Sequence, residues 1–125
     1  MNNNRNIILG KLGKLDYLDK EELFKLSIVG CDKAIELDPK DFHSYHIKGI
    51  SLYNLNKHNL ALDAFDKAIE LNPNDPNFYF DKSLALYCLG KYDEALEALN
   101  KALKLNPNYA NAQEMKQKLL KEIAK

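Results

Sequence analysis

Two histidines and two cysteines are the residues of this sequence whose chemistry first suggests a site. His43 and His46 lie three residues apart, a spacing that places both imidazoles on one face of a helix and could chelate a metal. Structural zinc needs four ligands, and no third histidine or cysteine is spaced to complete the set, Cys88 being the one remote candidate. We therefore expect the histidines to lie in a surface groove and expect no metal.

Residues Gly10 to Lys14 have the glycines and lysines of a phosphate-binding loop but not its spacing. Such a loop has four residues between its glycines and a serine or threonine after the lysine, and neither is present. No serine, cysteine or lysine stands near a histidine and a carboxylate in a pattern that suggests an activated nucleophile. The sequence therefore predicts a protein that is not an enzyme and that needs no cofactor.

Charge and composition restrict the classes of partner. Lys+Arg and Asp+Glu are both 18, so the chain lacks the basic excess from which nucleic-acid binders draw most of their affinity. Its apolar stretches are far too short for a signal peptide or a membrane span, and it has no glycosylation acceptor. Cys31 and Cys88 are too few for a disulfide scaffold. We expect a cytoplasmic protein with reduced thiols that binds neither nucleic acid nor membrane.

The elements that must position any site come from an internal repeat. Pro39, Pro73 and Pro107 are equally spaced along the chain, and each ends a similar segment that begins with Asp or Asn followed by Lys-Ala. Laying 42–75 over 76–109 gives 15 identities in 34 positions, whereas the front half of the unit 8–41 matches poorly. The sequence predicts a single domain over 1–125, made of a degenerate repeat 8–41, repeats 42–75 and 76–109, and a capping helix 110–124.

Each repeat is expected to form two helices. Apolar residues recur at helical spacing over Phe42–Leu55 and Asn59–Leu71, and again over Asn77–Leu89 and Tyr92–Leu105. Asp19 to Glu22 has the pattern of a helix start, so a longer helix should run from there to Leu37. A short or irregular helix is expected around Asn6–Leu18, and a final helix over Tyr109–Ala124 should turn Ala112, Met115, Leu119 and Ile123 inward.

The 34-residue period and the Ala-x3-Phe…Ala…Pro spacing resemble tetratricopeptide repeats. Ala61, Phe65, Ala68 and Pro73 match the family pattern in the second unit, and Gly49 stands at the family's glycine. Among the departures, Lys48 and Lys82 replace a usual leucine, and Ser83 replaces the glycine. The resemblance implies an all-α fold, a right-handed superhelix of about three helix pairs plus the C-terminal capping helix.

In the family, the first helices of successive units line a concave groove that binds an extended peptide or a helix. The matching residues here would form a peptide-binding groove: His43, His46, Ile50, Tyr53, Asn54, Asn77, Phe80, Leu84, Tyr87 and Cys88. Asp16 and Lys20 would extend it from the first unit, and Asn111, Glu114 and Lys118 from the last helix. The expected function is a protein–protein interaction module or scaffold that binds a partner of unknown identity in this groove.

Two further expectations follow from the resemblance. Some relatives clamp the acidic C-terminal tail of chaperones with lysine, asparagine and arginine, but the matching positions hold Leu12, Asp16, Ile47, Asn77 and Asp81. Because aspartates repel a carboxylate, no binding of such tails is expected. The alternative to a foreign partner is a self-associating structural protein, a homodimer or stacked assembly, whose groove is covered by its own chain.

Overall fold

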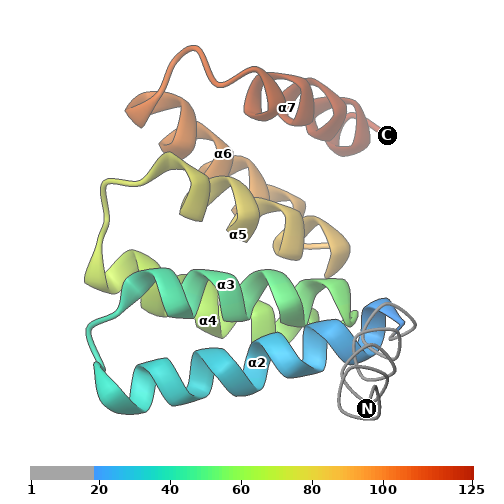
Figure 1. Ribbon diagram of the computed structural model, residues 1–125. Helices are drawn as coiled ribbons and strands as arrows, with labels where there is room; N and C mark the ends of the chain where they lie inside the picture. Colours follow the sequence, from blue (N-terminus) through green and yellow to red (C-terminus); the bar gives the residue numbers. More distant parts are fainter. Residues whose placement is uncertain (1–18) are drawn as a thin grey trace, which may run out of the picture.

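The computed structural model describes residues 19–125, and in this part of the chain every regular element is an α-helix. The helices are α2 (Lys20–Leu37), α3 (Phe42–Asn54), α4 (His58–Leu71), α5 (Pro76–Cys88), α6 (Tyr92–Leu105) and α7 (Ala110–Ile123). They stack in chain order from α2 to α7, each packing mainly on its neighbours in sequence (Figure 1). The predicted all-α repeat architecture is thus confirmed. The helix expected around Asn6–Leu18 lies outside the described residues.

Aspartates begin three of the helices by capping their first turns. Asp19 accepts a 2.8 Å hydrogen bond from the Glu22 amide at the start of α2, as its sequence pattern predicts. Asp41 accepts from both the amide and the hydroxyl of Ser44 at the start of α3. Asp75 caps α5, whose first residue is Pro76 rather than the predicted Asn77, because proline fits the first helical turn without loss of a hydrogen bond.

The turns inside the two complete repeats share one backbone geometry. Asn56 has φ +62° and Gly90, at the equivalent position of the next repeat, has φ +75°. In both turns the next amide bonds back to a helical carbonyl, from Lys57 to Leu52 and from Lys91 to Leu86, each at 2.9 Å. This is the left-handed helix cap that Gly90 predicts. After this cap α4 begins at His58, the position equivalent to Tyr92 of α6, which is one residue before the predicted start at Asn59.

Small residues bring the two helices of a repeat into close contact. Ala61 and Ala68 of α4 are fully buried, and Phe65 between them lies against Gly49 of α3. A Cβ atom built on Gly49 would fall 2.6 Å from Cδ1 of Phe65 and nearer still to Cε1. The ring can occupy this position only because residue 49 has no side chain. Residues that match the family pattern, Gly49 among them, thus form the contact between the two helices.

The C-terminal repeat and α7 share a second core. Its buried members are Leu86, Ala95, Ala98, Leu99, Ala112 and Leu119. Met115 is partly buried against this cluster, as expected. The prediction was wrong for Ile123, which is 40% exposed in the last turn of α7, because the cluster that buries Ala112 and Leu119 does not extend to this turn.

Lysines that depart from the family pattern form ion pairs between successive repeats. Lys48 Nζ of α3 lies 2.6 Å from Asp32 of α2, and Lys82 Nζ of α5 lies 2.7 Å from Asp66 of α4. The two lysines are separated by one repeat length, and so are the two aspartates, so the pairs occupy equivalent places. At the next position of the series, Asn100 stands where the aspartate would be and Lys116 where the lysine would be.

Candidate functional site

The residues predicted to form the groove lie on α3 and α5, the first helices of the two complete repeats, which lie between α2 and α7 in the stack (Figure 1). A hydrogen bond between the imidazole of His46 and the carboxylate of Asp81 joins α3 to α5, with Nε2 2.6 Å from Oδ2. Both side chains are mostly buried, at 17% and 22% exposure. This pair therefore fixes the separation of the two helices at the centre of the groove.

A cavity of about 220 Å³ lies beside this pair, and we refer to it as the central cavity. Its walls are mainly apolar, with one carboxylate and one amide: Ile50, Tyr53, Asn54, Phe65, Asp81 and Leu84. Ile50, Tyr53 and Asn54 come from α3, while Asp81 and Leu84 come from α5. Four of the predicted groove residues are thus brought together around one cavity. Apolar walls with a few oriented polar groups are typical of binding sites.

Tyr53 connects the central cavity to Cys88 at the end of α5. The Cys88 thiol lies 3.6 Å from the Tyr53 hydroxyl, within hydrogen-bonding distance for sulfur. Burial, together with Cys88 and the negative charge of Asp81, raises the pKa of Tyr53 to about 12. The Tyr53 ring packs edge-on against His58, with 5.1 Å between centroids. The phenol is therefore held in a defined position with its hydroxyl protonated at neutral pH.

Phe80 and Tyr87 face α7 rather than α3. Phe80 packs against Tyr109, with ring centroids 5.1 Å apart, and the Lys118 ammonium lies 5.2 Å from the centroid of Tyr87. A second cavity, of about 270 Å³ and here called the α7 cavity, is lined by Phe80, Asn111, Glu114, Met115 and Lys118. Asn111, Glu114 and Lys118, which were expected to extend the groove, all line this cavity.

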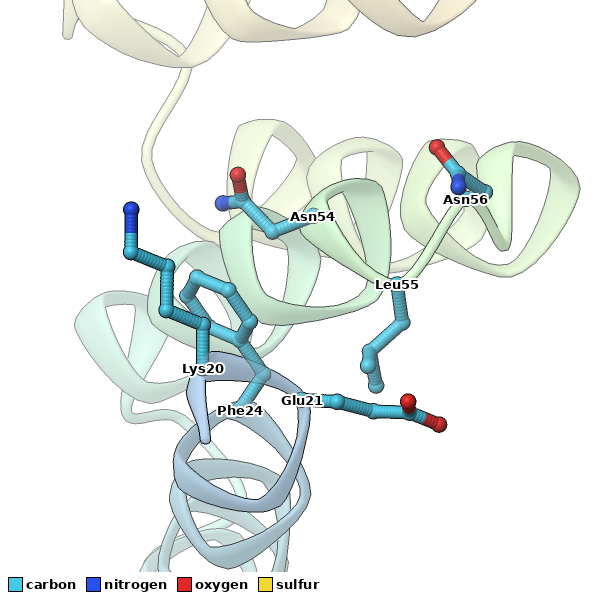
Figure 2. A pocket seen from close by; sticks show the side chains of 6 residues that line it. All are labelled: Lys20, Glu21, Phe24, Asn54, Leu55 and Asn56. Atoms are coloured by element: carbon cyan, nitrogen blue, oxygen red, sulfur yellow. The ribbon is translucent and has the colours of Figure 1, made fainter. Parts of the chain in front are cut away.

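A third cavity, of about 500 Å³, lies where the start of α2 meets the end of α3, and we call it the α2 cavity. Figure 2 shows Lys20 and Phe24 of α2 on the side of Asn54, whereas Leu55 points down towards Glu21. Asn54 lines both this cavity and the central one, and its side-chain amide donates to the Ile50 carbonyl at 2.8 Å. The two cavities therefore share Asn54 as a lining residue. Lys20, which was expected to extend the groove, lines the α2 cavity, and Asp16 lies outside the described residues.

The remaining predicted residues lie at the edges of the groove. His43 is exposed and its ring packs on Phe42, with centroids 4.5 Å apart. Asn77 is exposed in the first turn of α5, and Cys88 is an exposed free thiol in its last turn. His46 is instead directed towards Asp81 and the buried ring of Phe78. The two histidines are thus separated in role, although they share a helix.

Sequence reasoning missed seven residues that line the three cavities, among them Glu21, Leu55 and Asn56 of the α2 cavity. Phe24, Phe65 and Met115 were not assigned to the groove, and Asp81 was considered only as a departure from the acidic-tail clamp. Asp81 had a signal that could have placed it. Asn77, Asp81, Leu84 and Cys88 follow each other at spacings of four, three and four residues, which is one stripe of a helix.

Two further features are absent from residues 19–125. No group of three or more His, Cys, Asp and Glu side chains in this range is arranged to hold a metal ion. No helix in the same range is long and apolar enough to cross a membrane.

Solved structures similar to this chain include several that are described as TPR domains or TPR proteins. The first TPR of Spaghetti (RPAP3) bound to HSP90 peptide SRMEEVD is 22% identical, with TM-score 0.81 over 95% of this chain and 93% of that one. The Arabidopsis OM64 TPR domain is 21% identical, with TM-score 0.78 over 81% and 84%. YrrB, described as a TPR protein with an unusual peptide-binding site, is 25% identical, with TM-score 0.72 over 77% and 50%. No curated protein sequence matches this chain significantly.

The family comparison covers the repeats that carry the groove. The sequence model of the tetratricopeptide repeat matches residues 48–110, which is half of the chain and includes most of α3 and all of α4, α5 and α6. The chain belongs to the tetratricopeptide repeat family.

Proposed function

We propose that this protein is an interaction module that binds a peptide or a helix of a partner protein in the groove of α3, α5 and α7. The observation that carries the proposal is the pair of cavities, central and α7, that follow one another along the first helices of successive repeats. Ile50, Tyr53 and Leu84 remain partly exposed around the first, and Phe80 and Met115 around the second. Apolar side chains gathered on one accessible face are typical of protein interaction sites.

The groove also contains groups that would orient a bound chain. Asn54 and Asn77 are exposed and can exchange hydrogen bonds with a peptide backbone, while the apolar walls take alternate side chains. Relatives of the same fold support this mode of binding, since the RPAP3 domain is bound to a peptide and YrrB is described by its peptide-binding site. The module would act by binding alone, without catalysis or a cofactor.

The partner we propose is not an acidic chaperone tail. The peptide bound to the RPAP3 domain, SRMEEVD, carries three acidic side chains. In this chain Asp81 places a carboxylate in the middle of the groove, where it would repel such a peptide. Calorimetric titration of the SRMEEVD peptide into the protein should therefore give no measurable heat of binding, and an affinity in the micromolar range would refute this part of the proposal.

The groove is tested by affinity capture with matched variants. Wild type, a Tyr53→Ala/Tyr87→Ala variant and a Leu60→Ala variant would be immobilised, and proteins retained from extract would be compared by mass spectrometry. Leu60 is a suitable control because it is an exposed apolar residue of α4 that lines neither groove cavity. A protein retained by wild type and Leu60→Ala but lost from the double variant supports the groove. Equal recovery on all three would rule it out as the working surface.

A second candidate function, self-association, is favoured by the exposed face of α2. Leu23, Leu26 and Val29 are 47%, 55% and 66% exposed and follow each other at intervals of three residues. Such a stripe could pair with the same stripe of a second copy, burying both. Light scattering over a range of protein concentrations distinguishes the two functions, since a mass that doubles in wild type but not in Leu26→Glu supports the dimer.

A further inference from the structure

We propose that the segment bound in the groove carries a lysine or arginine whose cationic group sits on Asp81 in the central cavity. The inference rests on the proposed function and specifies the chemistry of the partner. The proposed occupant of the central cavity is a basic side chain of a partner protein. The alternative occupant is a second copy of this chain.

Asp81 links α3 to α5 through one carboxylate oxygen, and its other oxygen is placed for recognition of a partner. One carboxylate oxygen, Oδ2, accepts from His46, and within residues 19–125 no hydrogen bond to Oδ1 is formed. No lysine nitrogen of this range lies within 4.0 Å of the carboxylate. Asp32 and Asp66 differ in this respect, because each is neutralised by a lysine of the next repeat. Among these three aspartates of residues 19–125, the one in the groove is paired with a histidine and not with a lysine.

The walls of the central cavity suit the rest of a basic side chain. Ile50 and Leu84 offer apolar surface to the methylene stem of a lysine or arginine, which can be buried while its charged end stays paired. Tyr53 offers an aromatic face for the cation itself. The neighbouring part of the groove already shows this type of contact, since the Lys118 ammonium lies over the Tyr87 ring at 5.2 Å.

The negative charge of Asp81 affects one tyrosine beside the central cavity and another beside the α7 cavity. Burial and the interaction with Cys88 are the larger causes of the raised pKa of Tyr53 in the central cavity, and the negative charge of Asp81 adds to them. Burial and the same charge raise the pKa of Tyr109, which packs on Phe80 beside the α7 cavity. The carboxylate therefore acts on the groove as a negative centre, and a partner gains most by supplying the opposite charge.

The test begins with short random peptides displayed on phage and selected on the full chain. Selection runs in parallel on wild type, Asp81→Asn, Asp66→Asn and Tyr53→Ala/Tyr87→Ala. Asparagine preserves the size of the side chain and can still accept from His46, so Asp81→Asn removes the charge and keeps the link between α3 and α5. Asp66→Asn is the matched control, because it removes a carboxylate that pairs with Lys82 and lines neither groove cavity.

We expect wild type and Asp66→Asn to enrich peptides with a lysine or arginine at one fixed position, and Asp81→Asn to lose that preference. Calorimetry then compares an enriched peptide with the same peptide carrying uncharged norleucine at that position. Norleucine should weaken binding to wild type by about tenfold or more, and should leave binding to Asp81→Asn nearly unchanged. Raising the salt concentration should reduce the difference.

The outcomes separate this inference from the function on which it rests. Peptides that need Tyr53 and Tyr87 but show no fixed basic residue would overturn the inference and leave the groove intact. Peptides that bind the double tyrosine variant as well as wild type would overturn both. An absence of enriched peptides, combined with a mass that doubles with concentration, would place a second copy of the chain in the groove and also overturn both.

Discussion

The phenyl ring of Phe65 in α4 occupies the space that a side chain of residue 49 would fill. The ring therefore contacts the backbone of α3 directly at Gly49. Phe65 is only 1% exposed, and its ring is confined by Leu52, Ala61 and Ala85 as well. The ring therefore has little room to move if residue 49 acquires a methyl group.

Gly49→Ala should destabilise the protein. Overpacking costs about 1–3 kcal/mol and alanine regains up to about 1 kcal/mol of helix propensity, so we expect a net loss of about 1–2 kcal/mol. Chemical denaturation measures the change in the free energy of unfolding. Gly30→Ala is the control: no atom lies within 4 Å of its would-be Cβ, so the same substitution there should stabilise α2 by about 0.5–1 kcal/mol. Equal effects at the two glycines would contradict the packing argument.

The shared turn geometry predicts equal sensitivity at two positions that differ in residue type. Because Asn56 and Gly90 both have positive φ, Asn56→Ala and Gly90→Ala should each lose about 1 kcal/mol of stability. Asn56→Gly should change stability by less than about 0.5 kcal/mol, since both residues tolerate this conformation. Thermal denaturation of the three variants suffices. A neutral Gly90→Ala would show that the turn can relax to another conformation.

The ion pair between repeats should contribute little, and in a salt-dependent way. In a double-mutant cycle of Asp66→Ala and Lys82→Ala, we expect a coupling of about 0.2–1 kcal/mol, because the two side chains are 49% and 30% exposed. The coupling should shrink as the salt concentration rises. The same cycle applied to Asn100 and Lys116, whose position lacks the aspartate, should give a value near zero.

Most of the architecture could be predicted from the sequence because its signal is redundant. Prolines, buried alanines and polar turns all recur with the same period, so each helix is specified several times over. Helix starts at His58 and Pro76 were missed by one residue, since their side chains are compatible with both a turn and a first helical turn. The structure then gives the lysine-to-aspartate pairing, which a single repeat does not reveal.

The candidate site could be predicted only in part, for a geometric reason. Periodicity shows on which face of its own helix a residue lies. It does not show which of the two helices next to that face the residue contacts. Phe80 and Tyr87 are therefore on the expected face yet turn towards α7, while Leu84 on the same helix lines the central cavity with α3. Asp81 entered the sequence argument as a residue that excludes a ligand, and the cavity around it suggests what it would accept.

The raised pKa of Tyr53 predicts a loss of stability at high pH. An unfolded tyrosine ionises near pH 10, whereas Tyr53 in the folded chain does so at about 12. The stability linked to this group is therefore complete below about pH 10 and is lost as the pH rises towards 12. Tyr53→Phe removes the ionisable group, so its stability should fall less steeply over this interval in denaturant titrations.

Phenolate absorbance gives an independent check on the same residue. The difference between wild type and Tyr53→Phe should show one phenol that ionises near pH 12. Because Asp81 is one cause of the raised pKa of Tyr53, Asp81→Asn should move that ionisation to lower pH. A difference curve centred near pH 10 would mean that Tyr53 is fully hydrated.

The two ion pairs between repeats, Asp32–Lys48 and Asp66–Lys82, show that successive repeats are joined in the same way. Both residues of the second pair lie one repeat length after their counterparts in the first pair, so the two interfaces between repeats are equivalent. A duplicate of 42–75 inserted after residue 75 would meet 76–109 through the α4–α5 interface that the chain already contains. It would meet the first copy through a new joint of the same kind, at which Asp66 would pair with Lys48. The number of repeats, and with it the length of the groove, is therefore a property that the chain could change without changing its fold.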